Sequence, residues 1–341
     1  RRTEIFFTPI CVGCSQAFGS PLTCKIRFMN QEFAKDVLDG LNATPKSLPS
    51  KYFYDKKGDA IFQKIMDLKD YYLTRAEYEV FKANKSALAS TFLEGAERFD
   101  LIEFGAGDGH KTKVLLNYFL NAKIDFEYRP IDISGNVLDQ LQLTLKGELP
   151  DLVVKPIRDD YFRALERIEK STTIRSVVLF LGSNIGNFKH KKAIEFLSEL
   201  NARLKVNDLL LIGFDLKKDP DIILRAYNDA DGVTKAFNLN LLDRINNELD
   251  ANFDRSKFIH YPIYNPLTGT TKSFLVSTEN QTVEILDTAF HFEAWEAIHT
   301  EVSQKYSLKD VQRLARASGF TVVENFFDDK KYFVDSVWRK S

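Results

Sequence analysis

The most constraining feature of this sequence is the alternation of short apolar runs with helical segments between residues 99 and 214. Strands are predicted at 99–104, 126–133, 152–157, 176–181 and 208–214, and helices at 112–121, 136–146 and 191–204. In the last of these helices, apolar residues recur every three or four positions, which is the spacing of one buried face. Strands that alternate with helices form a parallel sheet covered on both sides, so we predict an α/β, doubly wound fold.

Residues 218–305 interrupt this alternation with a helical region followed by several strand-like runs joined by turns. Toward the C-terminus one helix and two strands resume the first pattern. We therefore predict a smaller α+β domain that is inserted into the larger one and that consists of residues 26–75 and 218–305. The larger domain then comprises residues 76–217 and 306–341, and residues 1–25 are left unassigned.

The charges of the chain are nearly balanced, with 47 Lys and Arg against 48 Asp and Glu and a formal net charge of −1. A protein that binds nucleic acid through its phosphates needs a basic surface, so we expect no nucleic-acid partner. The sequence also lacks a run of about 18 apolar residues that could cross a membrane, so we expect no membrane partner.

The cysteines Cys11, Cys14 and Cys24 all lie within the first 24 residues. An odd number of cysteines crowded into one segment argues against a disulfide scaffold and for a reducing compartment, so we expect a cytoplasmic protein. Separately, we expect a monomer. Cys11 and Cys14 have the spacing of metal ligands, but no second Cys or His pair follows at a suitable distance. We therefore expect ordinary thiols and no bound metal.

A glycine-rich turn follows the first predicted strand and reads Glu103-Phe-Gly105-Ala-Gly107-Asp-Gly109. Glycines at this turn let a cofactor approach the backbone and let the next helix pack closely on the strand. The dinucleotide-binding fingerprint needs its third glycine five residues after the first, where this chain has His110. The pattern instead resembles the first motif of the class I S-adenosylmethionine-dependent methyltransferases. A nicotinamide-dependent oxidoreductase and a purely structural glycine turn are the alternatives.

Polar residues follow the next three predicted strands. Asp132 ends the second strand, where a carboxylate accepts the ribose hydroxyls of a nucleoside cofactor, or else caps the helix that begins at Ser134. Asp160 and Tyr161 follow the third strand, where this fold places a hydrogen-bond partner and an aromatic wall for adenine. Asn187 lies in the loop after the fourth strand, where an amide both donates to and accepts from a ligand. The alternative for Asn187 is ordinary turn chemistry.

Long motifs at residues 45–75, 180–187 and 226–238 are more specific to one protein family than the glycine turn is. They resemble the histidine-specific Nα-methyltransferases of ergothioneine biosynthesis, and the resemblance covers about residues 30–340. It implies a class I methyltransferase, Rossmann-like sheet with an inserted substrate-binding domain. It also implies an enzyme that uses S-adenosyl-L-methionine to trimethylate the α-amine of L-histidine, forming hercynine.

The resemblance also implies site residues. It places the methyl donor against Tyr54, Gly105, Gly107, Lys111, Asp132, Asp160 and Tyr161. It places the amino acid against Tyr71, Asn187, Tyr227, Ser273, Glu301 and Ser303. Within this set, Asn187 and Tyr227 hold the carboxylate and amine, Glu301 and Ser303 hold the imidazole, and Tyr54 is the candidate catalytic hydroxyl.

The sequence departs from the family pattern at two places. The glycine loop of the family often reads Gly-Ser-Gly-x-Ser-x-Lys, whereas here Gly105 to Lys111 read Gly-Ala-Gly-Asp-Gly-His-Lys. Ser273 stands where a Met often lines the substrate pocket, so tryptophan or another amino acid is an alternative substrate. On spacing alone, the tyrosines are equally consistent with domain-interface aromatics and Glu301 with a solvated charge.

Overall fold

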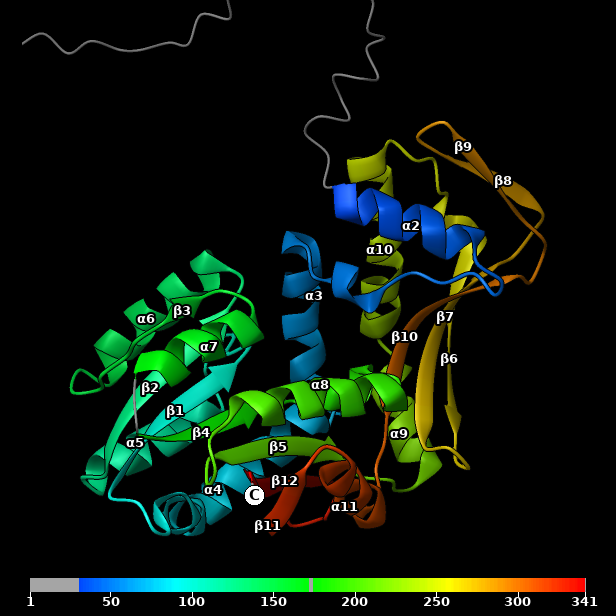
Figure 1. Ribbon diagram of the computed structural model, residues 1–341. Coiled ribbons are helices and arrows are strands. Elements are labelled where there is room, and N and C mark those ends of the chain that lie inside the picture. The colour runs from blue at the N-terminus through cyan, green and yellow to red at the C-terminus, as the bar shows by residue number, and fades with distance from the viewer. Residues whose placement is uncertain (1–30, 172–173, 341) are drawn as a thin grey trace, which may run out of the picture.

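A seven-stranded sheet forms the centre of the computed structural model, which describes residues 31–171 and 174–340 (Figure 1). Its strands are β1 (Arg98–Phe104), β2 (Asp125–Asp132), β3 (Ile157–Arg158), β4 (Arg175–Phe180), β5 (Leu209–Asp215), β11 (Phe320–Phe327) and β12 (Phe333–Lys340). Their order is β11-β12-β5-β4-β1-β2-β3. Strands β1 to β5 run parallel, and β12 and β11 are added as an antiparallel pair beside β5.

Helices cover both faces of this sheet, which confirms the predicted doubly wound fold. One face carries α4 (Leu73–Leu93), α5 (Thr112–Asn121) and α6 (Gly135–Glu148), and the other carries α7 (Tyr161–Ser171), α8 (His190–Arg203) and α11 (Leu308–Ala317). Strand β1 shows why both faces are apolar: Leu101 packs into one helical layer, and Ile102 packs into the other. Because side chains alternate along a strand, a strand buried on both faces reads as a continuous apolar run.

A second lobe packs beside the sheet (Figure 1). Its helices are α2 (Gln31–Asn42), η2 (Ser50–Phe53), α3 (Lys56–Asp67), α9 (Pro220–Tyr227), α10 (Val233–Leu249) and η4 (Arg255–Lys257). Its strands are β6 (Phe258–Asn265), β7 (Thr270–Ser277) and β10 (Ala297–Gln304), in the order β10-β7-β6, with a separate hairpin of β8 (Gln281–Ile285) and β9 (Thr288–Phe292). Phe33 of α2 and Phe53 of η2 share one apolar core with Ile245 of α10 and Leu275 of β7. The early part of the chain therefore packs onto the segment that interrupts the sheet.

Several elements differ from the sequence prediction. The strand predicted at 152–157 is reduced to Ile157–Arg158, with a single bridge from Val154 to Tyr128, because Pro156 has no amide hydrogen to donate to a ladder. Helices α7 and α9 and strands β9 and β10 were not predicted. Strand β10 buries polar residues such as Thr300 and Ser303, so it shows no apolar alternation.

Strand β10 also connects the second lobe to the edge of the central sheet. Just after it, the Tyr306 amide donates to the Asp215 carbonyl at 2.9 Å, and the Lys217 amide donates to the Tyr306 carbonyl at 2.8 Å. Asp215 is the last residue of β5. The end of β10 is thereby fixed at the carboxyl edge of the parallel strands, where ligands of open α/β sheets bind.

Among the residues that the structure describes, no helix is long and apolar enough to cross a membrane. Cys11, Cys14 and Cys24 lie outside the described residues.

Candidate active site

The glycine turn after β1 leaves its backbone open on one side. Gly105 and Gly107 both have positive φ angles, +64° and +55°, which side chains other than glycine rarely adopt. A Cβ atom on Gly105 would lie 3.0 Å from the hydroxyl of Tyr161, whereas nothing lies within 4 Å of a Cβ atom on Gly107. The turn therefore forms an open cradle that admits a ligand against the main chain.

Asp132 and Tyr161 stand beside this cradle. Asp132 ends β2, and its carboxylate accepts from the Ser134 amide at 2.8 Å, but the cap of α6 is Ser134, whose own hydroxyl accepts from the Val137 amide. Burial raises the pKa of Asp132 despite the bond from the Ser134 amide. The ring of Tyr161 lies parallel to that of Phe104, with 4.4 Å between the ring centroids. Asp132 and Tyr161 therefore place a carboxylate and an aromatic ring at the ends of adjacent strands.

The Asp160 carboxylate forms hydrogen bonds and an ion pair with the helix that follows it, which the sequence did not predict. Its carboxylate accepts from the amides of Phe162 and Arg163 at 3.1 Å each and pairs with the Arg163 side chain at 3.0 Å. These contacts cap the first turn of α7. Asp160 therefore fixes the position of Tyr161, the first residue of that helix.

Lys111 is held by a residue that sequence reasoning missed. Its ammonium forms an ion pair with Glu77 of α4, whose side chain is fully buried. The other Glu77 oxygen accepts from the Gly182 amide at 2.7 Å, in the loop after β4. Burial alone would lower the pKa of Lys111, but Glu77 outweighs it and raises that pKa. A buried Glu in a helix that precedes the glycine turn gives no sequence signal by itself.

A cavity next to this loop brings together most of the predicted substrate residues. It is lined by Tyr54, Tyr71, Asn187, Tyr227, Glu301 and Ser303, and also by Gly182 and Asn184 from the loop after β4. These residues come from the end of η2, which Tyr54 follows, from the α3–α4 connection, and from the short helix η3 (Asn184–Asn187) with the loop before it, α9 and β10. Because Gly182 also lies beside Lys111, the cavity adjoins the cradle of the glycine turn.

Aromatic rings form one wall of this cavity, which we call the aromatic wall: Tyr54, Phe62, Tyr71 and Phe237. Tyr54 meets the edges of Phe62 and Phe237 with ring centroids 5.5 and 5.6 Å away, and 48% of its side chain is exposed. Desolvation, reinforced by the Glu301 and Tyr227 groups nearby, raises the pKa of both Tyr54 and Tyr71. Both are therefore neutral phenols at neutral pH. Phe62 and Phe237 were not identified from the sequence because helical apolar residues are usually core.

Glu301 and Ser303 lie on the same side of β10, because side chains alternate along a strand. Ser273 pairs with Glu301 across the ladder to β7, and its hydroxyl donates to a Glu301 oxygen at 3.2 Å. Burial raises the pKa of Glu301, while Ser273 and Lys305 oppose that rise. Ser273 is not among the residues that line the cavity, so it supports Glu301 and does not face a ligand directly.

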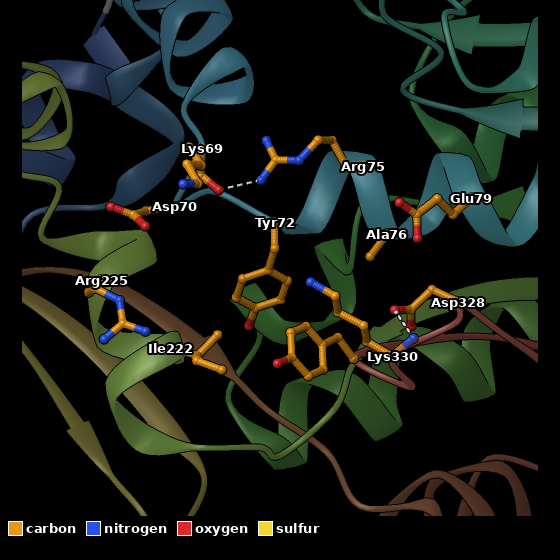
Figure 2. A pocket seen from close by; sticks show the side chains of 11 residues that line it. Lys69, Asp70, Tyr72, Arg75, Ala76, Glu79, Ile222, Arg225, Asp328 and Lys330 are labelled. Carbon is orange, nitrogen blue, oxygen red and sulfur yellow. Dashed lines mark hydrogen bonds between the residues drawn. The ribbon is translucent and has the colours of Figure 1, made fainter.

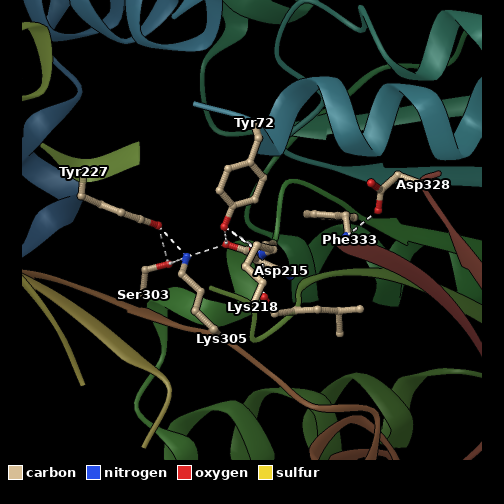
Figure 3. Close-up of polar contacts among 10 residues, drawn as sticks. Tyr72, Asp215, Lys218, Tyr227, Ser303, Lys305, Asp328 and Phe333 are labelled. Carbon is tan, nitrogen blue, oxygen red and sulfur yellow. Dashed lines mark hydrogen bonds and ion pairs between the residues drawn. The ribbon is translucent and has the colours of Figure 1, made fainter. Parts of the chain in front are cut away.

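Behind Tyr227 and Ser303 lies a buried network centred on Asp215 (Figure 3). Asp215 pairs with Lys305 at 2.7 Å and with Lys218, and it accepts from the hydroxyl of Tyr72 at 2.9 Å. Burial alone would raise the pKa of Asp215, but the two lysines outweigh it and lower that pKa. The position of Asp215 at the end of a buried strand is the one signal that could have identified it.

A second cavity, of about 210 Å³, lies next to Tyr72 and not Tyr71. Figure 2 shows Tyr72 between Ile222 and Lys330, with Arg75 and Arg225 nearby. None of the predicted site residues is among the described residues that line it, and its basic side chains are offset by Asp70, Glu79 and Asp328. The cavity beside the glycine turn is therefore the better candidate for chemistry. Within the described ranges, no three His, Cys, Asp or Glu side chains are placed to hold a metal ion.

Comparison with known proteins identifies the family of this chain. The family model for histidine-specific, S-adenosylmethionine-dependent methyltransferases matches residues 33–340. A histidine N-alpha-methyltransferase of Mycolicibacterium smegmatis is 37% identical, covering 81% of this chain and 85% of that protein. One of Mycobacterium tuberculosis is 35% identical, covering 86% and 91%. A more distant relative, an L-tryptophan methyltransferase of Psilocybe serbica, is 26% identical, covering 87% and 90%.

Proposed function

This chain belongs to the histidine-specific, S-adenosylmethionine-dependent methyltransferases, and from that premise we propose that it trimethylates the α-amine of L-histidine. The observation that carries the proposal is the cavity in which Glu301 and Ser303 lie together, next to the open glycine turn. A carboxylate and a hydroxyl on one face suit the two ring nitrogens of an imidazole, one of which donates and one of which accepts.

The residues at the strand ends fit S-adenosylmethionine, which supplies an electrophilic methyl group when it is bound. The missing side chains of Gly105 and Gly107 leave the main chain accessible at the place where a Cβ atom would intrude. We infer that Asp132 accepts the ribose hydroxyls and that Tyr161 provides one wall for the base. Lys111, fixed by Glu77, places a positive charge between the cradle and the cavity.

The amino acid is held so that its amine points toward the cradle. Asn187, at the end of η3, can both donate and accept, which suits the carboxylate and amine of an amino acid. The amine must lose a proton to solvent water before each transfer, because only its lone pair can attack. Since Tyr54 and Tyr71 are neutral phenols, they act as hydrogen-bond acceptors that orient the amine and not as phenolate bases.

The aromatic wall also suits the product. Methyl groups added to the amine create a permanent cation, and aromatic faces attract such cations. The ring centroids of Tyr54, Phe62 and Phe237 lie 5.5 to 5.7 Å from one another, and all three rings line the cavity. The reaction ends after three transfers because a quaternary nitrogen has no lone pair left.

The test is to incubate the protein with S-adenosylmethionine and each of the twenty amino acids and to measure the products by mass spectrometry. We expect a gain of three methyl groups on histidine only. A gain on tryptophan in place of histidine would instead identify the tryptophan-type substrate. Titration with S-adenosylhomocysteine and with NAD, followed by calorimetry, separates the methyltransferase from an oxidoreductase.

A further inference from the structure

The buried ammonium of Lys305 has no donor left for a ligand. Lys305 is fully buried, and its Nζ donates to Asp215 at 2.7 Å, to Tyr227 at 2.7 Å and to Ser303 at 2.9 Å. An ammonium has three hydrogens, so all three are used (Figure 3). Burial alone would lower the pKa of Lys305, but Asp215 and Tyr227 outweigh it and raise that pKa. Lys305 is therefore a fixed, charged donor.

This arrangement decides the direction of the hydroxyl of Ser303. The Ser303 oxygen accepts from Lys305 and also from the Tyr227 hydroxyl at 2.9 Å. A phenol is a stronger acid than an aliphatic alcohol, so in this pair the tyrosine donates and the serine accepts. Both lone pairs of the serine oxygen are then occupied. Ser303, which lines the cavity, can therefore still donate its own hydroxyl hydrogen to a ligand but cannot accept a further hydrogen bond.

Glu301 complements this donor from two residues earlier on the same strand. Ser273 contacts one of its carboxylate oxygens, and Glu301 also lines the cavity. An ionised carboxylate only accepts hydrogen bonds, whereas Ser303, as arranged here, only donates. The pair therefore suits a ring that has one N–H group and one nitrogen lone pair.

We propose that Lys305 is a specificity-determining positioning residue, which forces Ser303 to donate to the lone-pair nitrogen of a neutral imidazole. The proposal rests on the proposed function, because it assumes that the cavity holds histidine. Lys305 itself does not touch the substrate in this arrangement. It acts through Ser303, and its charge is retained because Asp215 balances it.

The test compares histidine with 3-(pyrrol-2-yl)alanine and 3-(pyrrol-3-yl)alanine, each of which keeps one ring N–H and replaces the other nitrogen by C–H. A donor that finds no acceptor in a buried site loses a whole hydrogen bond. The wild-type kcat/KM for histidine should exceed that for the better pyrrole analogue by roughly 10- to 100-fold. In Lys305→Met, Ser303 is free to rotate, so this ratio should fall by about 10-fold or more.

Two further variants keep the test decisive. Lys218→Met removes the other lysine that pairs with Asp215 but makes no contact with Ser303, so the ratio should stay at the wild-type value. Ser303→Ala removes the donor itself, and it should lower kcat/KM for histidine while leaving the pyrrole analogues nearly unaffected. If Lys305→Met fails to fold, an unchanged ratio in Ser303→Ala still overturns the inference.

The outcomes separate the two proposals. If wild-type protein does not methylate histidine, the proposed function is wrong, and this inference fails with it. If histidine is methylated but the wild type accepts the pyrrole analogues equally well, the function stands and the inference is overturned. The inference is also overturned if either Ser303→Ala or a folded Lys305→Met keeps the wild-type ratio.

Discussion

The buried carboxylate of Glu77 pairs with the ammonium of Lys111 and thereby joins helix α4 to the glycine turn after β1. The same carboxylate accepts from the Gly182 amide at 2.7 Å, so one side chain ties together the ends of two parallel strands. Those two strand ends border the cradle and the cavity. Glu77 therefore fixes the framework that borders the proposed donor and substrate sites.

Replacing Glu77 by Gln should destabilise the protein and weaken the binding of S-adenosylhomocysteine. The amide keeps an acceptor for Gly182 but leaves Lys111 without its counter-charge, and breaking a buried pair in this way costs about 3 kcal/mol. Urea unfolding and calorimetric titration measure the two effects. Glu79→Gln, two residues along the same helix and exposed, is the matched control. Equal stability of the two variants would show that the pair contributes nothing.

Replacing Asp132 by Ala should weaken the binding of S-adenosylhomocysteine. The change removes a charged acceptor for two hydroxyls, and each such bond contributes roughly 1.5–3 kcal/mol. Asp125→Ala, at the opposite end of β2 and exposed, controls for effects on the strand itself. If a folded Asp132→Ala protein binds the ligand with wild-type affinity, the assignment of Asp132 is wrong.

Replacing Glu301 by Ala should reduce kcat/KM for histidine by an amount equivalent to about 2–4 kcal/mol, with the binding of S-adenosylhomocysteine nearly intact. It should also relax discrimination against tryptophan, because the N–H of an indole lies in a different place from those of an imidazole and leaves a desolvated carboxylate unpaired. The comparison uses histidine and tryptophan with wild type, Glu301→Ala and the exposed control Glu284→Gln. An unchanged histidine-to-tryptophan ratio would remove the main support for this substrate assignment.

Glu103 predicts a pH dependence of stability. It is buried in β1, where burial raises its pKa to about 7, although hydrogen bonds from Tyr128 and Thr112 oppose the rise. Because its pKa is higher in the folded state than in the unfolded chain, the folded state binds the proton more tightly. Its contribution therefore favours folding at low pH and is lost as the pH rises from about 4.5 to about 7.

Glu103→Gln should remove that dependence, because the amide does not titrate. Urea unfolding at several pH values between 5 and 8 measures it. The free energy of unfolding of the wild type, relative to the variant, should fall by up to about 3 kcal/mol across this range. Parallel curves for the two proteins would mean that Glu103 is ionised throughout.

The sequence alone determined the architecture of the sheet and the place of the cradle. Strands such as β4 and β5 are buried on both faces, so they read as apolar runs, and the helices between them carry one apolar face each. The glycine turn was equally predictable, because Gly105 and Gly107 adopt backbone conformations that other residues avoid. The apolar runs, the helix faces and the glycine turn are all local patterns within short stretches of sequence.

The tertiary structure alone decided which buried polar groups support the predicted site residues. The sequence of strand β10 shows no apolar alternation, so neither its burial nor its contact with β5 could be predicted from its residues. Lys305 is an ordinary surface residue by type, and it is buried here because Asp215, Tyr227 and Ser303 supply its acceptors from β5, α9 and β10. A buried charge is tolerated only where partners from distant parts of the chain converge on it, and that convergence is a property of the fold.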